Sequence, residues 1–229
     1  MKKPQVAILA SGEGTTAESF VRAGAAGKID AGLALVICNK KDAGIFARME
    51  GLNRELGLNI RCVLINQQKH PAAPGEKVRP GDQTEAEEAA ILDILEAGNF
   101  DAICLMGYLK KAGPRLVHRF GGRAEYDSPY QAMMLNTHPG LLPDSMGLWG
   151  RHVQEFVLQN RLPFSGQSLI VVAEDYDVGT VITEHKVAVK TDDTPDSLFA
   201  RVQATEKKFL PRDIDEFIKR RQKYLKGEL

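Results

Sequence analysis

The sequence predicts an α/β fold in which a doubly wound, mostly parallel sheet carries helices on both faces. Two observations support this prediction: short apolar runs without polar interruption, and helix-compatible stretches that alternate with them. A parallel strand is covered on both faces, so it is apolar along its whole length and does not alternate. Regular strand–helix alternation is typical of βαβ units.

The first half of the chain shows this alternation repeatedly. We expect strands at 4–10, 33–38, 60–65 and 101–106. We expect helices at 15–26, 43–56 and 85–97. Such sheets bind ligands beyond the carboxyl ends of their strands, so the loops that follow Ala10, Met106 and Leu135 are the expected places for chemistry.

The second half has a different pattern. Residues 168–172 and 181–189 predict antiparallel strands around a polar loop, 174–180. Residues 195–223 predict a closing helix, bent or interrupted at Pro211 because proline removes a backbone donor. Two further stretches are expected to be surface insertions. These are 67–83 and 121–131.

Composition favours a small-molecule site. Lys plus Arg and Asp plus Glu both number 30, so the net charge is zero and no basic field exists to attract nucleic acid or an anionic membrane. No apolar run of about 18 residues and no signal-like start occur, so we expect a cytoplasmic protein. Cys38, Cys62 and Cys104 lie in apolar runs and are expected to be buried free thiols; their spacing suits no metal.

Asn136 and His138 are the first candidates for catalysis. They leave the end of a short apolar segment and lie two residues apart, so in extended backbone both side chains project to the same side. An amide donor can stabilise a tetrahedral oxyanion, and an imidazole can handle a proton near neutral pH. The residues alone leave open a turn in which the asparagine caps backbone groups and the histidine is only polar.

The surrounding segment, 135–143, reads LNTHPGLLP and resembles the Asn-x-His-Pro-x-Leu-Leu-Pro signature of the formyltetrahydrofolate-dependent transformylases. Segment 166–182 resembles the same family's strand, acidic loop and Asp-x-Gly turn. The resemblance covers most of the chain and is best to the purine-synthesis branch. It implies transfer of a formyl group from 10-formyltetrahydrofolate, as co-substrate, to the amine of glycinamide ribonucleotide, without a metal.

The resemblance also implies a catalytic trio of Asn136, His138 and Asp177. Asn136 and protonated His138 would stabilise the oxyanion, and Asp177 would pair with the imidazole and help to hold a water. A nearby carboxylate favours the imidazolium ion. The residues alone leave two alternatives open: Asp177 as a turn-stabilising aspartate, and Asp175 as the carboxylate that acts.

The glycine-rich loop after the first strand is a candidate phosphate site. Amides at a helix start and two threonine hydroxyls suit a phosphate, although a tight strand-to-helix turn also needs glycines. The resemblance assigns the acceptor's phosphate to this loop, with Gln203 of the last helix facing the phosphate end and Glu206 facing the ribose or the amine. The polar residues of that helix could also form a solvated face. The predicted acceptor-binding residues are Gly12, Glu13, Gly14, Thr15, Thr16, Gln203 and Glu206. Glu13 stands where the family often has asparagine, and its charge is unfavourable beside phosphate.

The turn after the strand at 101–106 resembles the family's Gly-aromatic-aliphatic-basic turn, which holds the pterin of the folate. The predicted folate-binding residues are Tyr108, Leu109, Lys110, Lys111, Ala112, Asn136, Ala173, Glu174, Asp175, Tyr176 and Asp177. Lys110 replaces the usual arginine and loses its bidentate fork. Thr84 stands where a second family arginine is expected, which leaves the contacts to the folate tail open.

We expect one formyltransferase domain over 1–229, with a phosphate-binding half at about 1–107 and a catalytic, folate-binding half at about 108–229, as a monomer or homodimer. Transferases for methionyl-tRNA or sugars usually carry a further C-terminal domain, and formyltetrahydrofolate hydrolase an N-terminal one, so both are less favoured. Another small-amine formyltransferase stays open. Outside this class, a non-catalytic ligand-binding protein and a dinucleotide-binding protein are the alternatives.

Overall fold

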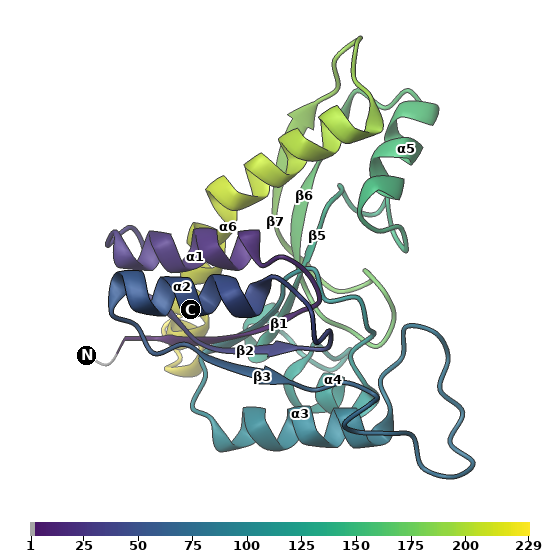
Figure 1. Cartoon of the computed structure of the whole chain (residues 1–229). Coiled ribbons are helices and arrows are strands. Elements are labelled where there is room, and N and C mark those ends of the chain that lie inside the picture. Colours follow the sequence, from purple (N-terminus) through teal and green to yellow (C-terminus); the bar gives the residue numbers. More distant parts are fainter. Residues whose placement is uncertain (1–2) are drawn as a thin grey trace.

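Seven strands form one sheet in the order β3-β2-β1-β4-β5-β6-β7. A computed structural model describes residues 3–229 of the chain (Figure 1). The strands are β1 Gln5–Ala10, β2 Gly32–Cys38, β3 Arg61–Leu64, β4 Ala102–Leu105, β5 Met134–His138, β6 Phe164–Val171 and β7 Val181–Ala188. Strands β1 to β5 are parallel, whereas β6 and β7 run antiparallel to their neighbours, so the mostly parallel sheet is confirmed.

Helices cover both faces of this sheet, as the alternation predicted. They are α1 Thr15–Ala25, α2 Ile45–Leu56, α3 Glu85–Ala97, α4 Pro114–Phe120, α5 Arg151–Gln159 and α6 Pro195–Leu225, with a short 3-10 helix η1 at Pro129–Gln131. Figure 1 shows α1 and α2 on one side of the strands and α3 and α4 on the other. The sequence analysis gave no ranges for α4, α5 or η1.

The central strand shows why its apolar run has no alternation. Val6, Ile8 and Ala10 join the core under α1, α2 and α6. Ala7 and Leu9 point to the opposite face and join the core under α3 and α4. All five are at most 1% exposed, so both faces of β1 are buried.

Helix α3 begins at Glu85, as the sequence predicted. A capping box at Thr84 explains this start. The Thr84 hydroxyl accepts the backbone N–H of Glu87 at 2.9 Å, and the Glu87 carboxylate accepts the backbone N–H of Thr84 at 2.8 Å. Two N–H groups that a helix start leaves free are thereby satisfied. Thr84 therefore has a structural role of its own at the position where a family arginine was expected.

Helix α6 was predicted to be bent or interrupted at Pro211. It is continuous through this residue, so an interruption is wrong. Figure 1 shows this helix descending from the upper end of the molecule and continuing behind α1 and α2. Leu210, Ile214 and Phe217 around the proline are each at most 1% exposed. Proline removes one helical hydrogen bond, and burial of these side chains offsets that loss.

The two predicted insertions differ in their contacts. Segment 67–83 contains no helix or strand and projects as a long loop in Figure 1. Its end is nevertheless fixed, since the Lys111 N–H donates to the Gly81 carbonyl at 2.7 Å and the Gly113 N–H donates to Gln83 Oε1 at 2.8 Å. Segment 121–131 contains η1 and starts against the end of β6.

Candidate active site

Asn136 and His138 lie within β5, not on a loop after it as the sequence analysis expected. Strand β5 extends to His138 because the antiparallel strand β6 pairs across both positions, with Asn136 opposite Ile170 and His138 opposite Ser168. The predicted alternation holds, since both side chains reach the same aspartate. His138 is only 3% exposed, so it is part of the buried sheet as well as a candidate catalyst.

Asp177 completes the predicted trio. Its Oδ2 atom lies 3.4 Å from His138 Nδ1, and its Oδ1 atom accepts from Asn136 Nδ2 at 3.4 Å. The Gly147 N–H also donates to Oδ2 at 3.1 Å. Asp177 has a φ of 57°, a left-handed conformation that aspartate tolerates better than most residues. The structure therefore gathers the three predicted side chains from β5 and the β6–β7 loop.

The rival carboxylate, Asp175, points elsewhere. Its side chain is 82% exposed and lies 3.4 Å from Lys111 Nζ, whereas the side chain of Asp177 is 8% exposed. Gly179 fixes this turn, because a Cβ atom there would lie 1.6 Å from the Val171 carbonyl oxygen. The turn therefore directs Asp177, and not Asp175, toward the histidine.

Ser145 binds the other nitrogen of the imidazole and was missed in the sequence. Its Oγ atom lies 2.8 Å from His138 Nε2 and also donates to the Leu141 carbonyl at 2.8 Å. The contact depends on how the backbone turns after β5, so no local pattern could have indicated it. His138 therefore has polar partners on both sides of its ring.

The opposite face of β5 reaches the predicted acceptor-binding residues. Thr137 projects away from the trio and donates to Glu206 Oε1 at 2.6 Å. Thr16, at the start of α1, donates to Glu206 Oε2 at 3.2 Å. Burial of this carboxyl raises its pKa, against the lowering effect of the two hydroxyl donors. Gln203 lies one helical turn earlier and is half-buried, with Thr15 beside Thr16.

Two glycines of the predicted phosphate loop differ in how much space surrounds them. A Cβ atom on Gly12 would have no neighbour within 4 Å, so the backbone there faces open space. Gly14 has a φ of +72°, and a Cβ atom on it would lie 2.5 Å from the buried Ile45 side chain. Gly14 is therefore required by packing and backbone conformation, whereas Gly12 leaves room for a ligand.

Glu13 does not direct its charge into the loop. Its carboxylate lies against Gly44 at the start of α2, where a Cβ atom would be 2.2 Å from Glu13 Oε2. The amino end of a helix carries partial positive charge, which suits a carboxylate. The Arg48 side chain also donates to the Glu13 carbonyl at 2.7 Å. This orientation removes much of the expected conflict with a phosphate.

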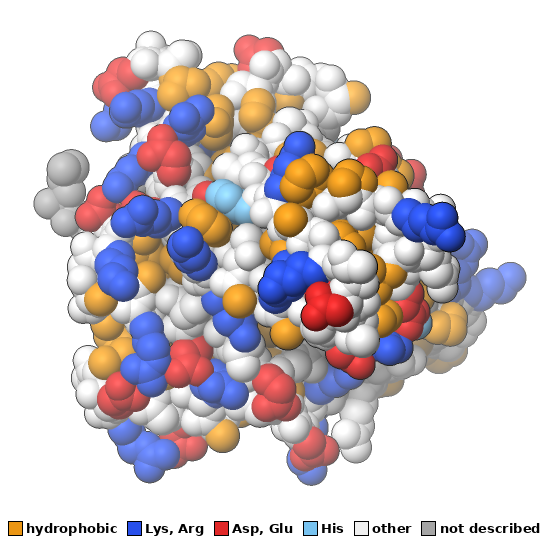
Figure 2. Space-filling model, turned by 90° about the horizontal axis from the view of Figure 1, so that it is seen from above, with side chains coloured by type: hydrophobic (Ala, Val, Ile, Leu, Met, Phe, Trp, Pro, Cys, Tyr) orange, Lys and Arg blue, Asp and Glu red, His pale blue; other side chains and the backbone are white. Residues whose placement is uncertain are grey.

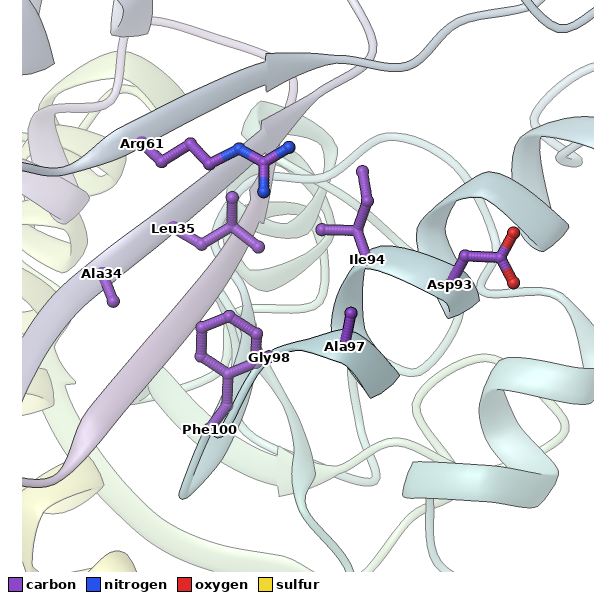
Figure 3. A pocket seen from close by; sticks show the side chains of 8 residues that line it. All are labelled: Ala34, Leu35, Arg61, Asp93, Ile94, Ala97, Gly98 and Phe100. Carbon is purple, nitrogen blue, oxygen red and sulfur yellow. The ribbon is translucent and has the colours of Figure 1, made fainter.

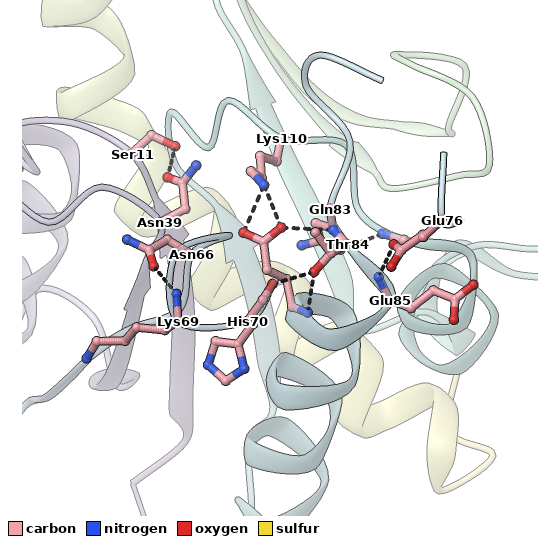
Figure 4. A network of polar contacts seen from close by, with 12 residues as sticks. Ser11, Asn39, Asn66, Lys69, His70, Glu76, Gln83, Thr84, Glu85 and Lys110 are labelled. Atoms are coloured by element: carbon pink, nitrogen blue, oxygen red, sulfur yellow. Dashed lines mark hydrogen bonds and ion pairs between the residues drawn. The ribbon is translucent and has the colours of Figure 1, made fainter. Parts of the chain in front are cut away.

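The predicted folate-binding turn is held by a polar network (Figure 4). Lys110 binds the buried carboxylate of Glu87 at 2.6 Å, so its charge is directed into the protein. The Leu109 N–H donates to Ser11 Oγ at 2.9 Å, and Ser11 in turn donates to Asn39 Oδ1 at 2.6 Å. The network joins the loops after β1, β2 and β4 to the start of α3.

Side chains of this turn face different surroundings. Leu109 is 55% exposed, whereas Ala112 is buried in the core under α3 and α4. Burial raises the pKa of Tyr108, whose hydroxyl accepts from Gln83 at 2.9 Å. Across from the turn, the predicted stretch Ala173, Glu174, Asp175 and Tyr176 leads into Asp177, and Lys111 Nζ lies 5.5 Å from the centre of the Tyr176 ring. The two predicted folate segments are therefore neighbours beside the trio.

A family model described as formyl transferase matches residues 4–214 of the chain. This match covers most of the sequence and includes every predicted site residue. The chain belongs to the formyl transferase family. The chain shares its seven-stranded sheet, with helices on both faces, with a solved member of that family.

Named relatives of this formyl transferase cover nearly all of its length. Phosphoribosylglycinamide formyltransferase of Haemophilus influenzae is 30% identical over 95% of this chain and 87% of the relative. The trifunctional purine biosynthetic protein adenosine-3 of Bos taurus is 29% identical over 92% of this chain, which spans only 18% of that protein. The Brucella melitensis phosphoribosylglycinamide formyltransferase structure superposes with a TM-score of 0.76 at 28% identity, over 95% of this chain and 96% of that one.

A formyltetrahydrofolate deformylase from Pseudomonas syringae also shares the fold. Its TM-score is 0.74 at 19% identity, over 95% of this chain and 62% of that one. Fold alone therefore does not separate formyl transfer from formyl hydrolysis, and the difference has to be tested by chemistry.

The surface and core of this formyl transferase agree with its mixed composition. Figure 2 shows acidic and basic side chains interspersed over the face in view. In residues 3–229, no helix is long and apolar enough to cross a membrane, and no three His, Cys, Asp or Glu side chains are grouped as a metal site. Cys38 and Cys104 are buried free thiols as predicted, whereas Cys62 is a free thiol that is only half-buried, which corrects the prediction. Partial burial raises the pKa of Cys62 to about 11.

A cavity of about 380 Å³ lies away from the trio (Figure 3). Its lining residues come from β2, the start of β3, and the end of α3 with the segment after it. They are Ala34, Leu35, Arg61, Asp93, Ile94, Ala97, Gly98 and Phe100. None of them is a predicted site residue, and the cavity opens near the amino ends of the strands, opposite the end at which α/β sheets bind their ligands.

Proposed function

We propose that this formyl transferase moves the formyl group of 10-formyltetrahydrofolate to the amine of glycinamide ribonucleotide, in purine synthesis. The observation that carries the proposal is the division of polar groups about β5. Asn136, His138 and Asp177 gather on one side of the strand, and Thr137 joins Thr16 and Glu206 on the other. The names of the relatives support the same acceptor.

The trio suits the chemistry of formyl transfer. The acceptor amine forms a bond to the formyl carbon, and a tetrahedral oxyanion results. Asn136 Nδ2 and protonated His138 Nδ1 are donors for that oxygen, both on the side that faces Asp177. The bond between the formyl carbon and the folate nitrogen then breaks, and the proton lost by the amine is passed to that nitrogen. Asp177 Oδ2 lies 3.4 Å from His138 Nδ1 and can hold a water for this proton transfer.

The acceptor would lie along the other predicted residues. The open backbone at Gly12 and the start of α1, which has no side-chain cap, offer free N–H groups to a phosphate. Glu206 offers a carboxylate to the ribose hydroxyls or to the amine. We take residues 1–229 as one formyltransferase domain, divided near residue 107 into acceptor and folate halves.

An absorbance assay of folate product tests the proposal. Wild-type protein should consume 10-formyltetrahydrofolate only when an amine is present, and glycinamide ribonucleotide should be the best acceptor in a panel of amines. Water alone is the control. Equally fast product without any amine would replace transfer by hydrolysis. A different preferred amine would keep the chemistry and change the acceptor.

A further inference from the structure

Thr137 is not among the predicted acceptor-binding residues, yet it contacts the carboxyl group that is proposed to bind the acceptor. Its Oγ1 atom donates to Glu206 Oε1 at 2.6 Å. Thr16 Oγ1 donates to the other oxygen, Oε2, at 3.2 Å. The carboxyl is therefore held at both oxygens, by one hydroxyl from β5 and one from the start of α1. The contact with β5 is the shorter of the two.

Gln167 orients the hydroxyl of Thr137. It lies on β6, next to β5, and is fully buried, and its Nε2 atom donates to Thr137 Oγ1 at 3.4 Å. A hydroxyl that accepts from an amide keeps its own hydrogen for another partner, which here is Glu206. The contact between the two oxygens also holds when Glu206 is protonated, because a hydroxyl can either donate or accept.

The alternation of β5 places Thr137 between the catalytic and acceptor sides of the sheet. Asn136 and His138, its neighbours in sequence, both reach Asp177 on one face. Thr137 projects to the other face, toward α6. Three consecutive residues therefore carry the two catalytic donors and a hydroxyl that touches the acceptor carboxyl.

We propose that Thr137 is a positioning residue that holds the Glu206 carboxyl in the orientation required by the acceptor. This inference rests on the proposed function, in which Glu206 binds the ribose hydroxyls or the amine. Each oxygen of a carboxylate can accept more than one hydrogen bond, so both oxygens can still receive one from the acceptor. Because β5 also carries Asn136 and His138, the same strand sets the position of the acceptor relative to the catalytic donors.

Other ionisable groups near Glu206 do not take the place of Thr137. Burial raises the pKa of Glu206, and among the groups that lower it Thr137 acts through a hydrogen bond and Lys207 through its charge. Lys207 is the next residue of α6 and is not a hydrogen-bond partner of the carboxyl. His185 on β7 is directed to Asp213, with its Nε2 atom 2.8 Å from Asp213 Oδ2.

Carboxyl-carbon NMR of Glu206 in the intact protein tests the contact without any substrate. Thr137→Val keeps the branched shape of the side chain and removes the hydroxyl donor, so the pKa of Glu206 should rise above its wild-type value. Thr137→Ser keeps a hydroxyl and should return the titration toward that of the wild type. In calorimetry, Thr137→Val should weaken binding of glycinamide ribonucleotide by roughly tenfold and leave binding of 10-formyltetrahydrofolate unchanged.

Thr183→Val is the matched control. Thr183 lies on β7 in the same row across the sheet as Thr137, with Leu169 of β6 between them. Its buried hydroxyl has no hydrogen-bond partner within residues 3–229. The same substitution at this position should therefore leave both the titration of Glu206 and the affinity for the acceptor unchanged.

An unchanged titration in a folded Thr137→Val protein overturns the proposal, and so does an equal loss of affinity for acceptor and folate. The wild type decides the matter if Thr137→Val does not fold. Its Thr137 hydroxyl hydrogen should exchange slowly with solvent, and rapid exchange overturns the proposal. A wild type that binds no glycinamide ribonucleotide would refute the proposed function, whereas the titration would still show whether Thr137 holds the carboxyl.

Discussion

Asp175 and Asp177 show how much a single residue position matters in this site. The two carboxylates are two residues apart, yet one is directed to solvent and Lys111, and the other is buried against His138. The difference comes from the left-handed backbone at Asp177 and the close approach of Gly179 to Val171. The family motif predicts Asp177 as the catalytic carboxylate, and the geometry of the turn explains why Asp177, and not Asp175, faces His138.

Asn136→Ala, His138→Ala and Asp177→Ala should each lower turnover by about two to four orders of magnitude, as loss of an oxyanion donor or an acid–base group does. Steady-state rates check this. With His138 already replaced, loss of Asp177 should lower turnover little further, since the groups act as a unit.

Because His138 is buried in β5, its alanine variant should also melt at a lower temperature. Asp175 is predicted to bind folate but not to act in catalysis, so Asp175→Ala should keep kcat near the wild-type value when folate is saturating. A large loss of kcat in Asp175→Ala, with Asp177→Ala near wild type, would identify Asp175 as the acting carboxylate.

Glu206→Gln should raise the melting temperature at neutral pH. Burial raises the pKa of Glu206, so the folded state binds its proton more tightly than the unfolded state does. The free energy of unfolding therefore falls as pH rises from 4.5, the ordinary pKa of the carboxyl group, to the raised pKa of folded Glu206. At higher pH it stays at this lower value. The neutral amide avoids this cost, and the advantage should vanish below the ordinary value. Thermal melts across pH test it, and an equal difference at every pH would mean that burial of charge is not the cause.

At the scale of an element, the loop between β1 and α1 contains two glycines with different roles. Gly14 is required by packing, whereas Gly12 has free space beside it. Gly14→Val should destabilise the whole protein, because its side chain would meet Ile45 in a left-handed backbone conformation. It is therefore a poor probe of ligand binding. Gly12 has space for a side chain and sits where a phosphate is proposed to bind.

Gly12→Val should leave the melting temperature nearly unchanged and weaken binding of the phosphorylated acceptor by about tenfold or more, since a branched side chain blocks backbone approach to phosphate. Calorimetry with the acceptor and with the folate separates the effects. Folate affinity should be unaffected. An equal loss for both ligands would indicate a structural loop without a phosphate site.

Elements that follow local rules could be predicted from the sequence. The capping box at Thr84 fixed the start of α3, and the apolar runs located the parallel strands. The extension of β5 through His138 could not be predicted, because it depends on pairing with β6 from later in the chain. Continuity of α6 through Pro211 also depends on tertiary packing. Ser145 had no local signal for the same reason.

At the scale of the whole molecule, the sequence predicted the fold class because each buried strand is apolar by itself. The shared phase of Asn136 and His138 followed from strand alternation. How Lys110 and Thr84 would be used did not follow, since both depend on the buried Glu87, which each of them contacts. The sequence motifs indicated which residues lie close together. Only the structure shows which of them are buried and which groups they contact.

The bond between Thr16 and Glu206 joins residues 190 positions apart. Protein synthesis proceeds from the amino terminus, so a growing chain carries Thr16 long before Glu206 exists. The residues of the parallel strands and of the trio have all been synthesised before those of α6 emerge from the ribosome. Assembly of the acceptor side therefore comes last, and an unfinished chain has half of the site without the helix that closes it.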